Sequence, residues 1–469
     1  MSCNKLHRGP RRTLVTTAVM VTLAAASIAG AIGATGAPDA TGVAAETVMP
    51  KFGGELRLRG EAFDNILDLS DAGDDSYQYW RMRYRLWADA TLREGLRLYL
   101  RFGNEYRMGV YSGAGSVRDA ESRVSLDNGW AEMSDAARGL SLRFGRMDLH
   151  FGEGFLICDG TPADGSSSAY FDAIRGTWWK RGGLSVDLFT AKLTDEGFGT
   201  PVRDEDLHGL YAKRRQIEAY VLYRFKRGAT VFQAGKPWEV PSPRQRTTAL
   251  GARWAHLPDA GWRAAVEGAY QLGRFEDAFD AGPGDDGNAR RAFGGYARAG
   301  WAADCCWRPA FEVGGLYLSG DDPGTARYEG WDDFYGEWPK WSELLIYTFL
   351  DCATRVGDEW TRSDDAGAWN NLTAVWLEGR ADLAPKLTVT VRGSVLGAPE
   401  ATGPGGGHNR GTLLAARADW TRWRGVALQA LGELFDPGDY YSHAGVYYDG
   451  QSVYGDRAWY ARFQIVTTF

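Results

Sequence analysis

The segment GLSLRFGRMDLHFGEGFLICDGTPADGSSSAYFDAIRGTW, residues 139–178, contains two alternating stretches separated by a loop. Its first part alternates, with Leu140, Leu142 and Phe144 separated by polar residues or glycine, and breaks at Gly-Arg-Met-Asp. A loop rich in Gly, Asp and Ser follows, and alternation resumes at Ala169. Because successive side chains of a β-strand point to opposite faces, the pattern predicts a strand, a long structured loop and a returning strand.

The composition favours a β-barrel in a membrane. Aromatic residues make up 13% of the 469 residues, with 19 Trp and 22 Tyr, and no apolar run beyond the N-terminus is long enough for a membrane helix. Outer-membrane barrels carry aromatic girdles at both membrane interfaces. On composition alone, a soluble all-β protein is the alternative.

The N-terminus predicts a secretory signal peptide over residues 1–45, so that the barrel occupies 46–469. Basic residues (Lys5, Arg8, Arg11 and Arg12) precede an apolar stretch rich in small residues. Val43-Ala44-Ala45 offers a cleavage site, and Ala37 offers another. We therefore expect export, and the bacterial outer membrane as the location.

The rest of the chain repeats an alternating segment of about ten residues followed by a connection, which is typical of membrane barrels. The predicted short turns are Arg93-Glu94-Gly95, Ala136-Ala137-Arg138, Arg181-Gly182-Gly183, Lys226-Arg227-Gly228, Pro258-Asp259-Ala260 and Ala384-Pro385-Lys386. The predicted long connections are 65–76, 110–121, 148–168, 194–212, 237–245, 276–289, 398–408 and 438–454. Short turns facing the periplasm and long loops facing outside fit such a barrel.

The parity of the strands fixes their number. Counting Leu344–Leu350 as a strand would give nineteen strands and would put the short turn at Ala384-Pro385-Lys386 on the external side, away from the other short turns. We therefore predict eighteen antiparallel strands, with 320–367 as one long external loop that contains a helix. The last segment supports the barrel, because it alternates and ends in Phe469, a pattern that resembles the recognition signal of outer-membrane barrels.

Arginines lie on the polar faces of the predicted strands, whereas Leu, Trp and Phe lie on the other faces. A charge on the lipid face costs about 2–4 kcal/mol at the membrane centre, so these arginines should point into the lumen. A solvated sheet face, the soluble alternative, would use Lys as readily. The candidates for the lumen are Arg57, Arg59, Arg81, Arg83, Arg85, Arg97, Arg101, Arg143, Arg392, Arg417 and Arg462.

An arginine-lined lumen suits an anionic solute, because guanidinium stays charged and binds carboxylate in a bidentate manner. The net charge of -7 does not contradict this, since many acidic residues cluster in predicted loops, as at Asp332-Asp333. Glu105 and several other carboxylates also face inward, where we expect them to pair with some arginines and leave a graded positive path.

An enzymatic site is disfavoured. Asp159 with Asp164, or Asp148 with Glu153, could form an acid–base pair, but loop carboxylates more often fix turns. The six His form no recognisable motif, and we expect no metal, no cofactor and no nucleic-acid partner.

Several motifs resemble those of the alginate export porins. They include Gly145-Arg146-Met147, Phe151-Gly152-Glu153, the run from Asp159 to Ser166, Tyr170-Phe171-Asp172, Gly103-Asn104-Glu105-Tyr106-Arg107, Gly320-Asp321-Asp322-Pro323-Gly324-Thr325, Glu329-Gly330-Trp331-Asp332 and Trp338-Pro339-Lys340-Trp341. The resemblance spans the mature chain and implies an eighteen-stranded barrel with an electropositive lumen that exports a polyuronate. Two positions depart from the family pattern: Met147 stands where Gln is commoner, and Phe334-Tyr335-Gly336-Glu337 lacks an expected Arg.

The sequence thus predicts an outer-membrane channel for an anionic polysaccharide, with membrane lipid and periplasmic export proteins as partners. Loops 148–168 and 320–367 should cover its mouth or fold inward and constrict it. A general anion or acidic-oligosaccharide uptake porin is the first alternative. An outer-membrane enzyme acting on polysaccharide or lipid is the second, and an adhesive barrel without conductance is the third.

Overall fold

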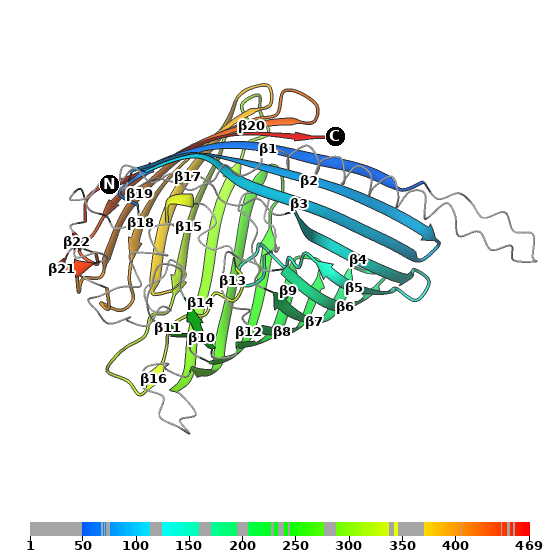
Figure 1. The fold of residues 1–469 in the computed structure, drawn as a ribbon, viewed down its shortest axis with the longest axis horizontal. Coiled ribbons are helices and arrows are strands. Elements are labelled where there is room, and N and C mark those ends of the chain that lie inside the picture. Colours follow the sequence, from blue (N-terminus) through cyan, green and yellow to red (C-terminus); the bar gives the residue numbers. More distant parts are fainter. Residues whose placement is uncertain are drawn as a thin grey trace, which may run out of the picture. The chain divides into compact units, whose positions relative to one another are not determined.

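A computed structural model gives the arrangement of the strands (Figure 1). It describes residues 49–66, 69, 71, 76–112, 124–158, 170–194, 205–226, 229–232, 239–242, 244–275, 288–336, 342–345, 370–403, 405–441, 443–447, 451–453 and 455–469. Pro50–Phe469 form one structural unit. The predicted signal peptide lies outside the described residues, and its boundary stays a prediction.

Eighteen antiparallel strands form a closed ring, which confirms the predicted fold. In ring order they are β1 (Lys51–Asp64), β2 (Tyr77–Arg93), β3 (Leu96–Ser112), β4 (Ser125–Asp135), β5 (Leu140–Met147), β6 (Tyr170–Lys180), β7 (Leu184–Thr194), β8 (Glu205–Arg214), β9 (Ile217–Lys226), β12 (Gln245–His256), β13 (Gly261–Phe275), β14 (Asn288–Ala302), β15 (Ala310–Leu318), β17 (Leu372–Ala384), β18 (Leu387–Gly397), β19 (Asn409–Trp420), β20 (Val426–Pro437) and β23 (Ala458–Thr468). The ring closes because β1 pairs with β2 on one side and with β23 on the other.

The two ends of the barrel differ as the parity argument requires. Short connections such as 94–95, 181–183 and 385–386 all join strands at one end. The first strand begins and the last strand ends at that same end, since Glu55 pairs with Thr468 and Lys51 pairs with Asp89. The longer connections join the strands at the other end.

The strand boundaries differ from the prediction between residues 194 and 245. We predicted a long connection over 194–212 and a short turn at 226–228, but β8 already begins at Glu205 and the short turn is Arg215-Gln216. Arg215 has a φ of 56°, a left-handed conformation that usually marks Gly or Asn, so no sequence signal announces this turn. Lys226 instead ends β9, and the chain leaves the ring for the hairpin of β10 (Ala229–Phe232) and β11 (Glu239–Ser242).

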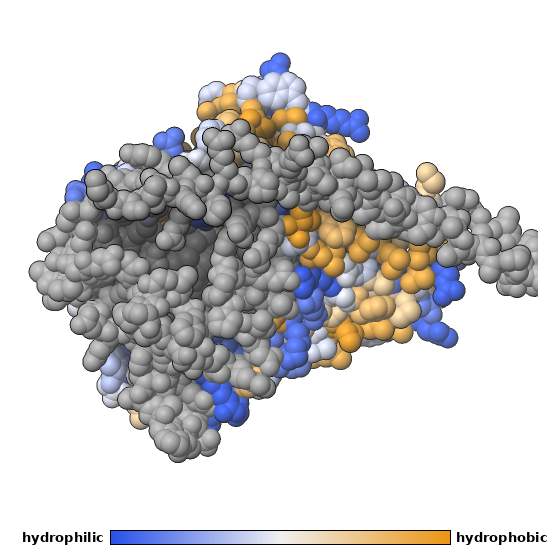
Figure 2. Space-filling model, in the orientation of Figure 1, coloured by the Kyte–Doolittle hydropathy of each residue, from blue (hydrophilic) through white to orange (hydrophobic). Residues whose placement is uncertain are grey.

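The wall has an apolar outer face and a polar inner face. Along β2, Trp80 and Leu86 are 43% and 45% exposed, whereas Arg81 and Arg83 between them are 3% and 4% exposed. Figure 2 shows the hydrophobic outer surface over part of the wall. Apolar side chains that cover the outside of a closed barrel match a surface immersed in lipid.

Smaller elements lie outside the ring of eighteen. They are β16 (Arg327–Tyr328), which pairs with β14, the hairpin of β21 (His443–Tyr447) and β22 (Gln451–Val453), and one helical turn at residues 343–345. This turn begins the segment that competed for a nineteenth strand, and the rest of that segment, 346–350, lies outside the described residues. The described residues contain no helix with the length and apolarity needed to cross a membrane.

Candidate functional site

The inner face of β1, β2 and β3 carries a dense group of arginines. Arg57 lies directly opposite Arg83, and Arg59 lies opposite Arg81, because β1 and β2 pair in this register. All four side chains are buried. Like charges that face each other across two strands destabilise a sheet, so this arrangement requires neighbouring carboxylates.

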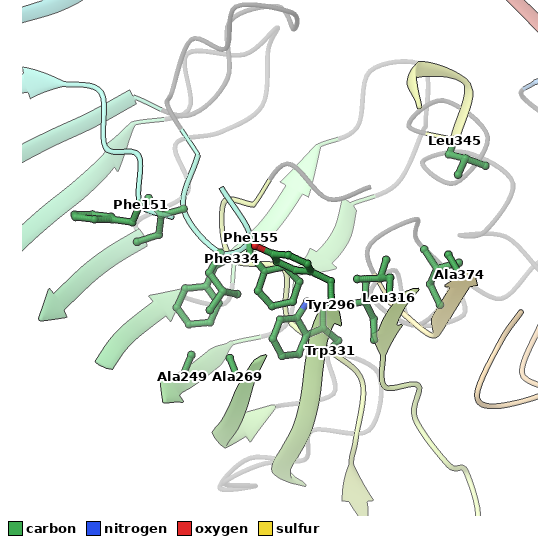
Figure 3. Packing of buried hydrophobic residues seen from close by; sticks show 14 of the residues in the cluster. Phe151, Phe155, Ala249, Ala269, Tyr296, Leu316, Trp331, Phe334, Leu345 and Ala374 are labelled. Atoms are coloured by element: carbon green, nitrogen blue, oxygen red, sulfur yellow. The ribbon is translucent and has the colours of Figure 1, made fainter. Parts of the chain in front are cut away.

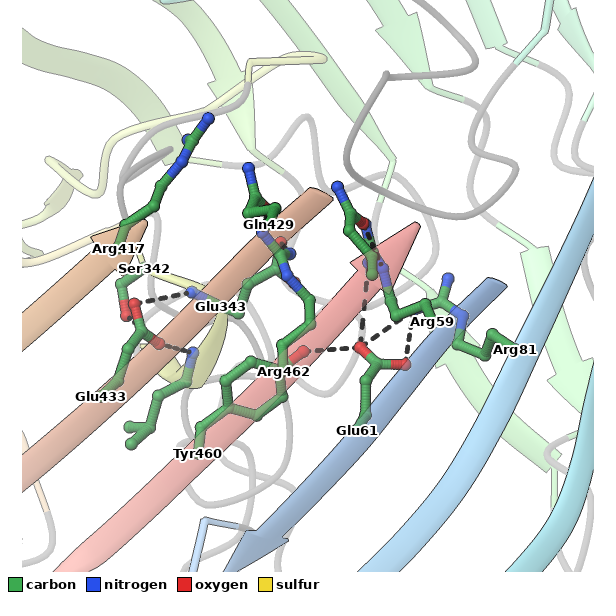
Figure 4. A network of polar contacts seen from close by, with 12 residues as sticks. Arg59, Glu61, Arg81, Ser342, Glu343, Arg417, Gln429, Glu433, Tyr460 and Arg462 are labelled. Atoms are coloured by element: carbon green, nitrogen blue, oxygen red, sulfur yellow. Dashed lines mark hydrogen bonds and ion pairs between the residues drawn. The ribbon is translucent and has the colours of Figure 1, made fainter. Parts of the chain in front are cut away.

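Glu105 on β3 and Glu61 on β1 supply part of that compensation. One oxygen of Glu105 lies 2.6 Å from Arg57, and the other lies 2.6 Å from Arg81. Glu61 lies 3.2 Å from Arg81 and 3.8 Å from Arg59, and it also accepts a hydrogen bond from Tyr460. Figure 4 shows Arg59, Glu61 and Arg81 extending from neighbouring strands toward one another.

Three more carboxylates complete this group. Arg83 pairs with Glu55 at 2.7 Å, Arg85 pairs with Asp127 at 3.2 Å, and Arg101 pairs with Asp148 at 3.0 Å. In the described part of the chain, six arginines (57, 59, 81, 83, 85 and 101) therefore share five carboxylates (55, 61, 105, 127 and 148). We call these eleven residues the arginine group; six minus five leaves one net positive charge.

The other predicted lumen arginines also have acidic partners, and they are scattered around the ring. Arg97 and Arg417, whose side chains are 44% and 47% exposed, are the most accessible. The pairs are Arg97–Asp89, Arg143–Glu132, Arg392–Glu378, Arg417–Asp419 and Arg462–Glu343. Pairing is thus more extensive than we expected from the sequence. The loop residues Asp159 and Asp164 lie outside the described residues.

The long loop after β5 folds inward and lies against the wall between β7 and β14. Phe151 stacks on Phe189 of β7 and on Tyr211 of β8, with ring centroids 5.1 and 4.5 Å apart. Glu153 reaches farther, to Arg253 of β12 at 2.8 Å and Arg298 of β14 at 2.6 Å. The carboxylate that we considered for catalysis is therefore an ion-pair partner of two strands.

A second loop, which follows β15, meets the first inside the barrel. Phe155 packs against Tyr296 of β14 and against Trp331, and Figure 3 shows these rings together with Phe334. The backbone of Ile157 forms a parallel bridge with Tyr335. We call residues 148–158 and 331–336 the insert. Its position confirms, for the described residues, that these loops fold inward.

Asp332 anchors the second loop to the wall. Its carboxylate is buried and lies 2.8 Å from Arg224 of β9 and 2.5 Å from Arg290 of β14, and it accepts a hydrogen bond from Thr247 at 2.8 Å. Burial alone would raise the pKa of Asp332, but the two arginines outweigh it and lower the pKa to about 2. The sequence predicts Asp332 as one of the acidic residues that cluster in loops, and the structure places its carboxylate in buried ion pairs.

The same loop touches the wall again at residues 342–345. Ser342 caps the helical turn by accepting a hydrogen bond from the Leu345 amide at 3.1 Å. Glu433 of β20 accepts a hydrogen bond from the Leu344 amide at 2.6 Å, and Glu343 pairs with Arg462 of β23 at 2.6 Å (Figure 4). These contacts give Arg462, a predicted lumen residue, a partner from a loop.

Three of these residues, Arg290, Arg298 and Glu433, are not among the lumen residues that we predicted from the sequence. Arg290 and Arg298 share a face of β14 with Ala292 and Tyr296, and Gly and Ala residues blur the alternation there. Glu433 alternates with Leu434 and could have been found by strand parity. No sequence pattern indicates which loop residue will meet these side chains, because the contacts join residues far apart in the chain.

The sequence also matches a known family. A family model described as Alginate export matches residues 49–454, which includes every strand of the ring except the last, β23. The chain belongs to the alginate export family. Together with the closed barrel, this membership makes it an outer-membrane channel protein of that family.

Solved porins share the fold of this alginate export family member. Pseudomonas aeruginosa OccK5 (OpdH) is 12% identical, with a TM-score of 0.51 and coverage of 89% of this chain and 98% of that chain. OpdK of the same organism, solved with vanillate, is 11% identical with a TM-score of 0.52 and the same coverage. Acinetobacter baumannii OccAB2 is 14% identical, with a TM-score of 0.52 and the same coverage. Among curated proteins, none matches this sequence.

The described residues hold no cluster of three or more His, Cys, Asp or Glu side chains placed to bind a metal ion. The carboxylates of the arginine group, Glu153 and Asp332 are directed at arginines. Such an interior can bind and orient charged groups of a solute through charge-assisted hydrogen bonds.

Proposed function

We propose that this alginate export family member passes an anionic polysaccharide, an alginate-like polyuronate, through a lumen lined by arginines. The arginine group carries the proposal, because six arginines and five carboxylates share one inner wall. A polyuronate brings carboxylates at regular spacing, which can replace the resident carboxylates one after another at the guanidinium groups.

The exchange of partners gives a mechanism for movement. An arginine that is paired with a carboxylate keeps its charge and its orientation in the absence of solute. Binding that is shared among several such sites stays weak at each one, as conduction requires. Export from the periplasm, with periplasmic export proteins delivering the chain, is the direction that the family description supports.

The test uses the purified protein in planar lipid bilayers. We expect reversal potentials in a salt gradient to show preference for anions, and current block by polyuronate fragments but not by neutral dextran of the same length. A preference for cations, or equal block by dextran, would contradict the proposal.

A second candidate is uptake of small organic acids. OpdK, which shares the fold, was solved with vanillate, an aromatic carboxylate. Liposomes that carry the protein in their membrane distinguish polyuronate export from uptake of small acids. Uptake of small acids without block by polyuronate favours this second function. An enzyme would instead show turnover that is lost in Asp159→Ala or Asp164→Ala while conductance remains.

A further inference from the structure

We propose that four arginines on the outer face of the barrel bind the phosphate groups of a phosphorylated glycolipid in the outer leaflet of the membrane. They are Arg246 of β12, Arg274 of β13, Arg291 of β14 and Arg327 of β16, and we call them the outer basic patch. The proposal uses the outer-membrane location and is independent of the solute that passes through the lumen.

Strand parity directs the patch outward. All four side chains are exposed, whereas Thr247 and Arg290, which are neighbours of two of them in the chain, are 0% and 1% exposed and belong to the inner face. Phe293, two positions after Arg291, is 48% exposed and shares the outward face of β14. The four guanidinium groups therefore lie on the side of the wall that meets the membrane.

The register of the strands brings the patch together. Arg246 lies directly opposite Arg274. Arg274 in turn lies opposite Ala289, and Ala289 lies opposite Arg327. Arg291 occupies the next outward position of β14 after Ala289. Because neighbouring strands lie about 4.8 Å apart, the four arginines occupy a stretch of about 15 Å along this edge of the wall.

The patch lies at the external boundary of the apolar wall. β12 and β14 begin, and β13 ends, at the end of the barrel that carries the long connections, which faces the cell exterior in such proteins. On β14 the outward positions from Phe293 to Trp301 are Phe, Gly, Ala, Ala and Trp. The distance from Arg291 to Trp301 is about 34 Å along the strand, and a tilt of about 40° reduces it to a depth of about 26 Å. This depth matches the apolar band of about 25 Å in such barrels, so Arg291 lies level with the lipid headgroups.

The surroundings leave the patch available to an anion. In the part of the chain that the structure describes, no carboxylate forms an ion pair with Arg246, Arg291 or Arg327. Asp206 of β8, on the same outer edge, pairs with Lys192 at 2.7 Å. The predicted lumen arginines, in contrast, have acidic partners from the chain itself. The outward charges can therefore take their partners from the membrane.

The chemistry of the patch suits a lipid that carries phosphate. Guanidinium binds phosphate in a bidentate manner. Like charges that lie directly opposite each other destabilise a sheet, and a phosphate bound between Arg246 and Arg274 would offset this repulsion. Arg246 also lies over the ring of Phe225, 5.8 Å from its centroid, which orients its guanidinium across the outer face. Leu272 and Phe293, 39% and 48% exposed, lie beside the arginines on the membrane side, where acyl chains can pack.

The first experiment measures the binding of lipid A, a disaccharide with a phosphate at each end, to the purified protein in detergent by native mass spectrometry. We expect Arg246→Gln with Arg291→Gln to bind lipid A about thirtyfold more weakly than the native protein, which corresponds to about 2 kcal/mol. We also expect the native protein to bind dephosphorylated lipid A more weakly than lipid A. Equal affinities in either comparison would overturn the proposal.

Two matched variants separate the patch from general effects of charge and folding. Arg422→Gln with Arg424→Gln removes the same charge from exposed arginines in the turn between β19 and β20, at the periplasmic end, and should bind lipid A like the native protein. Arg246→Lys with Arg291→Lys keeps the charge and should retain most of the affinity. A loss in either variant as large as in the glutamine variant of the patch, with all variants folded by circular dichroism, would count against the patch.

Competition identifies the ligand. The competitors are phosphatidylglycerol, which has one phosphate and acyl chains, and inorganic phosphate, which has no acyl chains. We expect neither to displace lipid A at equal concentration. Displacement by phosphatidylglycerol would indicate a site for any anionic lipid, and displacement by inorganic phosphate a site for a free anion, so either would overturn the assignment to a glycolipid. The anion selectivity of the lumen is measured separately by the bilayer currents, and each proposal can fail without the other.

Discussion

At the scale of single residues, the carboxylate of Asp332 shows how this barrel keeps charges inside its wall. A buried carboxylate with one partner is barely compensated, but Asp332 has two arginines and a threonine hydroxyl as well. Glu153 repeats the arrangement with Arg253 and Arg298. Both residues were visible in the sequence as loop carboxylates, and nothing in the sequence distinguished them from solvated ones.

The low pKa of Asp332 gives a prediction about acid stability. A carboxyl group with an ordinary pKa of 3.8 and a folded pKa of about 2 stabilises the fold fully above about pH 4. That contribution is lost as the pH falls through 2. We expect Asp332→Asn to lower the unfolding temperature in detergent at pH 7 and pH 5, and the gap to the native protein to close toward pH 2. Circular dichroism at stepwise pH measures both proteins; a gap that persists at pH 2 would contradict the assignment.

At the scale of elements, turns were predictable where their residues restrict the backbone and unpredictable where they do not. The turns at Arg181-Gly182-Gly183 and Ala384-Pro385-Lys386 carry Gly or Pro and stand where we placed them. Arg215-Gln216 carries neither, and it was missed, whereas Lys226-Arg227-Gly228 looks like a turn but leads into a longer excursion. The two faces of each strand were easier to predict than the turns. Lipid on one side and polar groups on the other require apolar and polar residues to alternate along a strand.

Two turn glycines provide a matched test of backbone geometry. Gly139 has a φ of 65°, and a Cβ placed there would collide with the carbonyl oxygen of Trp179. Gly182 has a φ of 109°, but open space surrounds it. We expect Gly139→Ala to destabilise the barrel by more than about 1 kcal/mol, and Gly182→Ala to cost less. Unfolding in urea measures the difference; equal losses would mean that the collision is relieved at no cost.

At the scale of the whole molecule, the number of strands, the closed fold and the membrane location were predictable from the sequence, since they depend on patterns repeated along the chain. The arrangement of the interior was not. Which arginine meets which carboxylate depends on ring order and on loops that return from distant strands, as Glu343 does to Arg462. That arginines alternate with apolar residues along the strands could be predicted, but not the extent of their pairing.

The net charge of the arginine group gives a prediction about salt. The Debye length falls from about 10 Å at 0.1 M salt to about 3 Å at 1 M. An excess of one positive charge spread over a wall acts across the passage only at low salt. We expect the preference for anions, measured by reversal potential, to decrease steadily between these concentrations. A preference that stays constant would indicate selection by direct binding instead of by the field.

The pairing of β1 with β23 has a consequence for biogenesis. Glu55 and Thr468 meet across a hydrogen-bonded seam, although almost the entire chain separates them. Until that seam forms, both borders of the sheet present amide and carbonyl groups that hydrocarbon cannot satisfy. Insertion into the bilayer therefore cannot be completed strand by strand during synthesis. Either the nascent sheet waits at the membrane surface, or assembly machinery shelters its two borders until the final strand arrives.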